Sequence, residues 1–124
     1  MMGALAVAAG AAVGALLRWW LGMLLNPVFP VLPMGTLAVN VLGGYGIGLA
    51  IAYFSAHPGI APEYRLFAIT GFLGGFTTFS TFSAEVVTNF SRGLWGWGVT
   101  QIGLHLAGSL LGTVAGLATL RGYR

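Results

Sequence analysis

Four long apolar stretches, nearly free of charged side chains, occupy most of this 124-residue chain. Each can cross a bilayer, whose hydrocarbon core takes about 20 mostly apolar residues in a helix. Only 6% of the residues are charged and 57% are apolar, which leaves nothing for a soluble domain. We therefore predict an all-α integral membrane protein of the cell membrane (inner or plasma), with one four-helix domain over residues 1–124. The predicted spans are 3–25, 34–54, 66–87 and 94–120.

Composition excludes several other classes of protein. The first stretch lacks a basic segment before it and continues past any small-residue cleavage point, so we expect a span, not a secretory signal. The absence of cysteine excludes disulfides and thiolate metal sites. A net charge of +3 from five arginines is too sparse for a nucleic-acid surface. Two glutamates and two histidines cannot supply a nucleophile, a base and an orienting acid, so we expect no enzyme.

The arginines are nearly balanced between the two sides of the membrane. With four spans, Arg65, Arg121 and Arg124 share one side, and Arg92 lies on the other, joined by Arg18 if that side chain reaches its nearer interface. Orientation in the membrane follows the bias of Lys and Arg, which is almost absent here. The chain could insert both ways and pair with an inverted copy, or a weak ordinary bias could be resolved by other factors.

Every predicted span carries glycines four residues apart. Small residues at this spacing let helices approach closely in lipid, where no hydrophobic drive exists between them. The pattern favours close packing and leaves open whether the partner helix belongs to the same chain. The pairs are Gly10 and Gly14, Gly44 and Gly48, Gly71 and Gly75, and Gly108 and Gly112.

The third span is predicted to be broken near its middle. Gly71, Gly74 and Gly75 weaken the helix locally. Non-helical backbone at membrane depth is tolerated only where it is buried in protein or lines a cavity. A break exposes carbonyl oxygens, which suit a hard cation such as Na⁺, and it leaves the next half-helix with free N–H groups.

Aromatic and hydroxyl side chains follow this break. Phe79 and Phe82 are three residues apart and share a helix face. The positive edges of their rings, together with the hydroxyls, could pass a small anion, although packing alone explains two phenylalanines equally well. A hydroxyl often bonds to its own helix four residues back, but the number here exceeds that need. The hydroxyl residues are Thr77, Thr78, Ser80, Thr81 and Ser83.

The second and fourth spans also carry polar residues. Asn40 either bonds to a neighbouring helix or offers N–H donors to an anion. In the fourth span His105, Ser109 and Thr113 recur every four residues and form a polar stripe, which Gln101 extends. We expect no carboxylate to face this stripe, which makes cation transport by charge pairing unfavourable.

Two charged residues lie near predicted span ends. Glu85 is expected near an interface, as a vestibule group or a solvated helix end. Arg18 is expected to extend along the apolar surface to the interface, and at a pore mouth it would also attract anions.

Several of these segments resemble the CrcB/Fluc family of fluoride channels. The run Gly-Gly-Phe-Thr-Thr-Phe-Ser-Thr-Phe-Ser at residues 74–83 is highly specific. The resemblance covers essentially the whole chain. The matching pieces are residues 14–19, 35–44 and 71–85, with a looser match over 105–113.

The resemblance implies a fold and a function. The fold is an antiparallel, dual-topology homodimer in the membrane with two narrow pores, through which cytoplasmic fluoride leaves the cell down its electrochemical gradient. A central structural Na⁺ would be held by the backbone carbonyls of Gly74 and Thr77 from each subunit. The partners implied are fluoride, membrane lipid and a second copy of the chain.

The resemblance also implies residue roles. Phe79 and Phe82 would line the pores with their ring edges, Asn40 would be the pore asparagine, and Arg18 would lie at an aqueous vestibule. The roles of Gln101 and His105 stay open, because some members carry a tyrosine and a serine there. A polar track along the path would comprise Ser80, Thr81, Ser109 and Thr113, with Glu85 toward its exit.

Two other functions compete with the channel. A small multidrug-type exporter also forms a dual-topology dimer of four-helix chains, but it needs a membrane-buried carboxylate, typically in the first helix. The first span has none. A non-transporting membrane scaffold would explain the glycines and aromatics, but it leaves Asn40 and the clustered hydroxyls without a purpose.

Overall fold

The computed structural model describes residues 1–121, and all the regular structure in this part of the chain is helical. Four of its helical segments are long and apolar enough to span a membrane, as predicted: Met2–Val28, Met34–Ala56, Pro62–Ser91 and Trp95–Arg121. The last residues, including Arg124, lie outside the described part. The elements are α1 (Met2–Leu25), η1 (Asn26–Val28), α2 (Met34–Ala56), α3 (Pro62–Arg65), η2 (Leu66–Leu73), α4 (Gly74–Phe76), α5 (Phe79–Ser91) and α6 (Trp95–Arg121).

The segment Pro62–Ser91, called the third span below, is longer than the 66–87 expected. It begins early because Pro62 occupies the first turn of α3, where a missing N–H costs nothing. It ends late because α5 continues to Ser91, and the chain then turns at Gly93, whose φ of +74° suits glycine. Its first half contains η2, a π-helix, which is a wider coil with i to i+5 hydrogen bonding.

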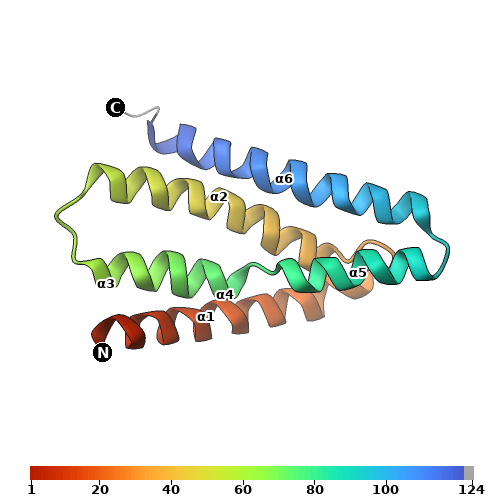
Figure 1. Ribbon diagram of the computed structural model, residues 1–124, viewed down its shortest axis with the longest axis horizontal. Helices are drawn as coiled ribbons and strands as arrows, with labels where there is room; N and C mark the ends of the chain where they lie inside the picture. The colour runs from red at the N-terminus through yellow and green to blue at the C-terminus, as the bar shows by residue number, and fades with distance from the viewer. Residues whose placement is uncertain (122–124) are drawn as a thin grey trace.

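The helices pack as two pairs. Figure 1 shows α2 beside α6 and α1 beside the first half of the third span, with α5 continuing toward the far end. Both ends of the described chain and the α2–α3 connection lie at one end of the bundle, and the other two connections lie at the opposite end (Figure 1). Arg65 and Arg121 are therefore at one end and Arg92 is at the other.

Glycines hold α2 and α6 close together. Gly44 and Gly48 of α2 lie against the carbonyls of Ser109 and Thr113, so that a Cβ atom on either glycine would collide with backbone. In return, a Cβ on Gly112 of α6 would lie 2.9 Å from the carbonyl oxygen of Val41. The contact is therefore backbone against backbone, as small residues at this spacing allow.

Glycines also allow direct backbone contact between α1 and the third span. A Cβ on Gly10 would lie 2.7 Å from the amide nitrogen of Phe72, and one on Gly75 would lie 2.6 Å from the carbonyl oxygen of Ala11. The predicted close packing is thus present, and the glycine pairs meet helices of the same chain. Large apolar side chains such as Leu111 and Val114 remain exposed on the outer faces, where lipid or a second chain would contact them.

Candidate functional site: an interrupted helix and its polar contacts

The helical path of the third span is interrupted at Thr77 and Thr78. Both residues have extended backbone, with φ and ψ of −87° and 159° at Thr77 and of −151° and 116° at Thr78. Thr78 then caps α5, because its hydroxyl oxygen accepts a hydrogen bond from the Thr81 amide at 3.2 Å. The glycines expected to weaken the helix, Gly74 and Gly75, are themselves helical, so the extended residues come after them.

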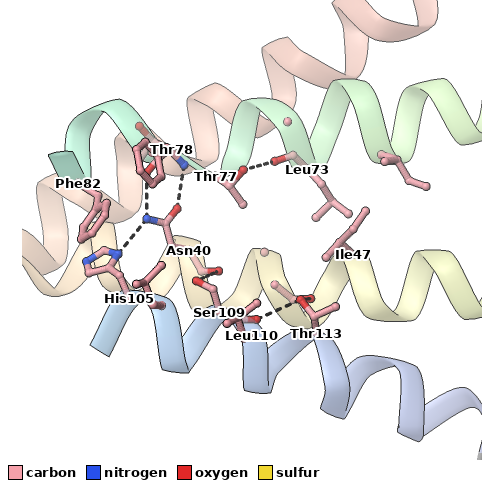
Figure 2. A pocket seen from close by; sticks show the side chains of 16 residues that line it. Asn40, Ile47, Leu73, Thr77, Thr78, Phe82, His105, Ser109, Leu110 and Thr113 are labelled. Carbon is pink, nitrogen blue, oxygen red and sulfur yellow. Dashed lines mark hydrogen bonds between the residues drawn. The ribbon is translucent and has the colours of Figure 1, made fainter. Parts of the chain in front are cut away.

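Asn40 of α2 supplies the hydrogen bonds that the extended backbone loses. Its Nδ2 donates to the Thr78 carbonyl at 2.9 Å, and the Thr78 amide donates to its Oδ1 at 2.8 Å (Figure 2). The side-chain amide of Asn40 thereby forms the same pair of hydrogen bonds with Thr78 that a neighbouring β-strand would form. This pairing meets the requirement that backbone polar groups at membrane depth have a protein partner.

The four carbonyls of residues 74–77 lose their helical donors at the interruption, and the Gly75 carbonyl accepts from Arg18 Nε instead. In a continuous helix the Thr78 amide would donate to the carbonyl of Gly74, but it donates to Asn40. The Thr81 amide would likewise donate to the carbonyl of Thr77, but it donates to the Thr78 hydroxyl. Gly74 and Thr77 are the two residues whose carbonyls the resemblance implies for a cation.

A cavity of about 460 Å³ lies between α2, the third span and α6, and we call it the central cavity. Figure 2 shows Asn40, Thr78, Phe82 and His105 at one end of it and Ile47 and Thr113 toward the other. Of the residues predicted for the pathway and the cation, those that line it are Asn40, Gly74, Thr77, Phe79, Phe82, Ser109 and Thr113.

Ser80, Thr81 and Glu85 do not line the central cavity. Ser80 is exposed on the outer surface of α5. Thr81 lines two smaller cavities, one shared with Arg18 and one shared with Glu85. The predicted polar track is therefore divided in one chain between the central cavity and the surface around α5.

The hydroxyls of the central cavity donate to backbone carbonyls. Ser109 donates to the Asn40 carbonyl at 3.3 Å, and the single hydroxyl hydrogen of Thr113 is shared between the carbonyls of Gly44 and Ser109, each at 3.0 Å. Thr77 donates to the Leu73 carbonyl at 2.9 Å, as Figure 2 shows. Each of these hydroxyls would have to rotate away from its carbonyl to donate to an anion.

Phe79 and Phe82 lie together, with ring centroids 5.4 Å apart and planes at 69°, so that the edge of one ring meets the face of the other. Their environments differ. Phe82 is 6% exposed and stacks on His105 at 4.3 Å, whereas Phe79 is 73% exposed in the single chain. The inner ring has a fixed partner, and the outer ring is largely exposed in the single chain.

Glu85 is the centre of a hydrogen-bonded cluster that the sequence analysis missed. Its Oε2 accepts from the Thr36 hydroxyl at 2.7 Å, and its Oε1 accepts from Gln101 Nε2 at 2.9 Å. Asn89 Nδ2 donates to Gln101 Oε1 at 3.0 Å and to the Val31 carbonyl at 3.0 Å. The cluster joins α2, α5, α6 and the α1–α2 connection.

The expectation that no carboxylate faces the polar stripe of α6 is therefore wrong, because Glu85 bonds to Gln101 at its end. Spacing along α6 shows which of its own residues share a face, but it does not show which side chain of α5 lies opposite. One signal was available in the sequence. Glu85 and Asn89 are four residues apart, so both face the same direction.

Arg18 turns inward from α1. Its Nε donates to the Gly75 carbonyl at 3.0 Å, and the side chain lines a second cavity of about 320 Å³ together with Thr36, Thr78 and Thr81. The bond to the third span replaces the extension along the apolar surface that the sequence predicts. The positive charge lies beside Gly75, which is between Gly74 and Thr77 in the chain.

Known proteins resemble this chain along most of its length. The family model described as CrcB-like protein, Camphor Resistance (CrcB), matches residues 5–117. A protein of Thiobacillus denitrificans named fluoride-specific ion channel FluC is 62% identical over 117 residues, which cover 94% of each chain. Proteins of the same name from Pseudomonas paraeruginosa and Cupriavidus taiwanensis are 60% and 58% identical, covering 94% and 97% of this chain and 91% and 95% of their own.

Proposed function

The chain belongs to the CrcB family of multi-pass membrane proteins, and we propose that it is a fluoride channel that lets cytoplasmic fluoride leave the cell down its electrochemical gradient. The observation that carries the proposal is the interrupted third span, whose extended backbone bonds to Asn40. Asn40, Phe79 and Phe82 line the same cavity. The matching relatives are named as ion channels, which argues against the exporter, scaffold and enzyme alternatives.

Fluoride is small, strongly hydrated and a strong hydrogen-bond acceptor. A pathway for it has to replace water with protein donors and positive ring edges. The central cavity offers both kinds of group, with amide and hydroxyl donors on α2 and α6 and aromatic edges on α5. A narrow passage between the rings excludes the larger chloride ion.

The functional unit is an antiparallel homodimer. Phe79 keeps 73% of its surface exposed within the described chain, and a second copy would cover it. The nearly balanced arginines, with Arg65 and Arg121 at one end and Arg92 at the other, permit insertion in both orientations. Pairing of opposed copies closes a two-fold interface in which each subunit completes a pore of the other.

The residues at the interruption fit a small hard cation. Carbonyl oxygens at broken membrane helices coordinate Na⁺, and the carbonyls of Gly74 and Thr77 are among the four that lose their helical donors at the break. When bound at the dimer centre, Na⁺ supplies a positive charge that offsets anion charge in a low-dielectric surrounding. The side chains keep the carbonyls available, because Asn40 and the Thr78 hydroxyl occupy the competing amides.

Fluoride efflux from proteoliposomes tests the function. Purified protein is reconstituted in vesicles loaded with potassium fluoride or potassium chloride, valinomycin balances charge, and ion-selective electrodes record release. The expected result is rapid fluoride release without chloride release, and none from protein-free vesicles. Folded protein that releases neither anion, or both at similar rates, contradicts a fluoride-specific channel.

Replacing Na⁺ by N-methylglucamine, which is too large for a site between carbonyls, tests the cation separately. The thermal unfolding temperature in detergent is expected to fall without Na⁺ and to recover when Na⁺ is returned, because ligand binding to the folded state stabilises it. An unchanged unfolding temperature across Na⁺ concentrations contradicts the cation proposal and leaves the flux result unaffected.

A further inference from the structure

The imidazole of His105 is buried in the middle of α6, with 3% of its surface exposed. One ring nitrogen, Nδ1, lies 3.1 Å from Asn40 Nδ2. The other, Nε2, is the buried side-chain nitrogen or oxygen that has no hydrogen-bond partner within residues 1–121. A buried polar atom without a partner is unfavourable, so a group in this state at a candidate ion pathway requires an explanation.

Asn40 determines which nitrogen of His105 carries the hydrogen. The backbone of Thr78 orients the Asn40 amide, because its N–H requires the oxygen and its carbonyl requires the nitrogen. Asn40 Nδ2 is therefore a donor toward His105, and Nδ1 must be the acceptor. The neutral ring then carries its hydrogen on Nε2. An imidazolium would place an Nδ1–H of His105 opposite the N–H of Asn40.

The side-chain donors around His105 are already in use. Asn40 has two amide hydrogens, and these go to the Thr78 carbonyl and to His105 Nδ1. Ser109 and Thr113 donate to backbone carbonyls. The Nε2–H of His105 thus differs from its neighbours in the central cavity, because it can donate without breaking an existing hydrogen bond.

The position of Nε2 connects two polar regions. Figure 2 shows His105 under Phe82, with one nitrogen toward Asn40 and the other on the far side of the ring. The ring centroids of His105 and Phe82 are 4.3 Å apart. Gln101 is one turn earlier on the same face of α6 and bonds to Glu85. His105 therefore lies between the Glu85 cluster and the central cavity.

We propose that His105 binds fluoride through Nε2–H, between the Glu85 cluster and the central cavity, and that Asn40 acts on this step by holding the tautomer. The inference rests on the proposed function for its ligand. Fluoride accepts a hydrogen bond from Nε2–H while it passes the edge of Phe82, and Asn40 keeps its own bonds to Thr78. Asn40 is a positioning residue in this account.

Two substitutions separate the two nitrogens of the ring. Gln places an amide N–H near Nε2, and Asn places an acceptor near Nδ1. His105→Gln is expected to retain fluoride efflux, whereas His105→Asn keeps the contact to Asn40 and is expected to lose efflux by about tenfold to a hundredfold, as loss of a hydrogen bond to a charged partner predicts. His57→Asn is the matched control, because His57 is exposed and bonds only to the Tyr53 carbonyl.

Nitrogen NMR of the bilayer-reconstituted protein gives a readout that needs no flux. With ¹⁵N-histidine in the His57→Asn background, His105 is the only imidazole in the chain. The expected spectrum has a protonated Nε2 and an unprotonated Nδ1. Addition of sodium fluoride is expected to shift the Nε2–H signal, and sodium chloride at the same concentration is expected to leave it unchanged.

The outcomes distinguish this inference from the function on which it rests. Wild-type efflux together with equal efflux in His105→Asn overturns the His105 role and leaves the channel standing. A signal insensitive to fluoride, as a trapped water on Nε2 would give, or a hydrogen on Nδ1, overturns it as well. Absence of wild-type efflux contradicts the proposed function, and a fluoride-specific shift of Nε2–H would still support anion binding at His105.

Discussion

Asn40 is bonded to both backbone polar atoms of Thr78 and to His105 Nδ1, so one side chain satisfies three partly buried groups. Replacing it with Leu leaves all three without partners, at about 1–3 kcal/mol for each buried group. Asn40→Asp keeps only the acceptor for the Thr78 amide. Thermal unfolding in detergent is expected to rank wild type above Asn40→Asp, and Asn40→Asp above Asn40→Leu.

The control for this series is Thr100→Val, because Thr100 is exposed and its hydroxyl bonds only to the Gly96 carbonyl of its own helix. It is expected to unfold at the wild-type temperature. If Asn40→Leu also unfolds there, the bonds to Thr78 do not stabilise the interruption.

The two phenylalanines differ in burial, and substitution by Ile exploits that difference. Both Phe79→Ile and Phe82→Ile are expected to abolish fluoride efflux, because Ile has no ring edge for an anion. Both variants lose the edge-to-face pair of Phe79 and Phe82, but Phe82→Ile is expected to lower stability by about 0.5–1.5 kcal/mol more, because it also loses the stack on His105.

Efflux from proteoliposomes and unfolding in detergent measure the two effects independently. Normal efflux in both variants would show that the two rings do not line the pathway. Equal destabilisation by both would show that the burial seen in the single chain does not describe the folded state in detergent.

At the scale of the helices, α2 and α6 are held by direct backbone contact. Gly116 is buried, and a Cβ there would lie 2.8 Å from the amide nitrogen of Leu49, whereas Gly103 on the same helix has nothing within 4 Å. Gly116→Ala is expected to separate the helices and lower the unfolding temperature. Gly103→Ala is expected to match or exceed wild type, because Ala is favoured over Gly in a helix by about 1 kcal/mol.

Circular dichroism melts of the two alanine variants, with size-exclusion chromatography before heating, provide the comparison. A Gly116→Ala protein as stable as Gly103→Ala would mean that the α2–α6 contact tolerates an added methyl group.

Hydropathy alone predicts the four spans, because a bilayer requires long apolar helices and this chain has little else. The place of the extended residues was harder to predict. Gly74 and Gly75 suggest a weak helix, yet the carbonyl of Ala11 lies beside Gly75, so that glycine serves packing while remaining helical. Thr77 and Thr78 are extended instead, since Asn40 of another helix supplies the bonds there.

The cluster around Glu85 was missed for a related reason. It combines side chains from three helices with a backbone carbonyl of the α1–α2 connection, and its geometry depends on how α5 is rotated against α6. Periodicity within one helix does not contain that information. Asn40 alone has two explanations in the sequence, and its pore role is implied by the family resemblance; its partner Thr78 is 38 residues away.

The whole molecule has arginines at both ends, which predicts insertion in both orientations. Labelling from one side of the membrane can test this prediction. The chain has no cysteine, so a single introduced thiol reports one position. Gly59→Cys lies in the α2–α3 connection, with nothing within 4 Å, and Ser91→Cys lies at the opposite end of the bundle. In intact cells, a membrane-impermeant maleimide is expected to label roughly half of either variant, because opposed copies are present together.

Permeabilised cells supply the control, in which both variants should label completely. Full labelling of one variant and none of the other in intact cells would show a single orientation and would contradict the antiparallel homodimer.

The bond between Asn40 and Thr78 also has a consequence for biosynthesis. A ribosome delivers residue 40 to the bilayer before residue 78, so the amide that Thr78 requires is already in place when the third span emerges. Inserted alone, the third span would expose an unpaired N–H and carbonyl to hydrocarbon. A permuted chain in which the third span is synthesised first should therefore insert that span poorly, because the partner of its extended backbone would not yet be in the membrane.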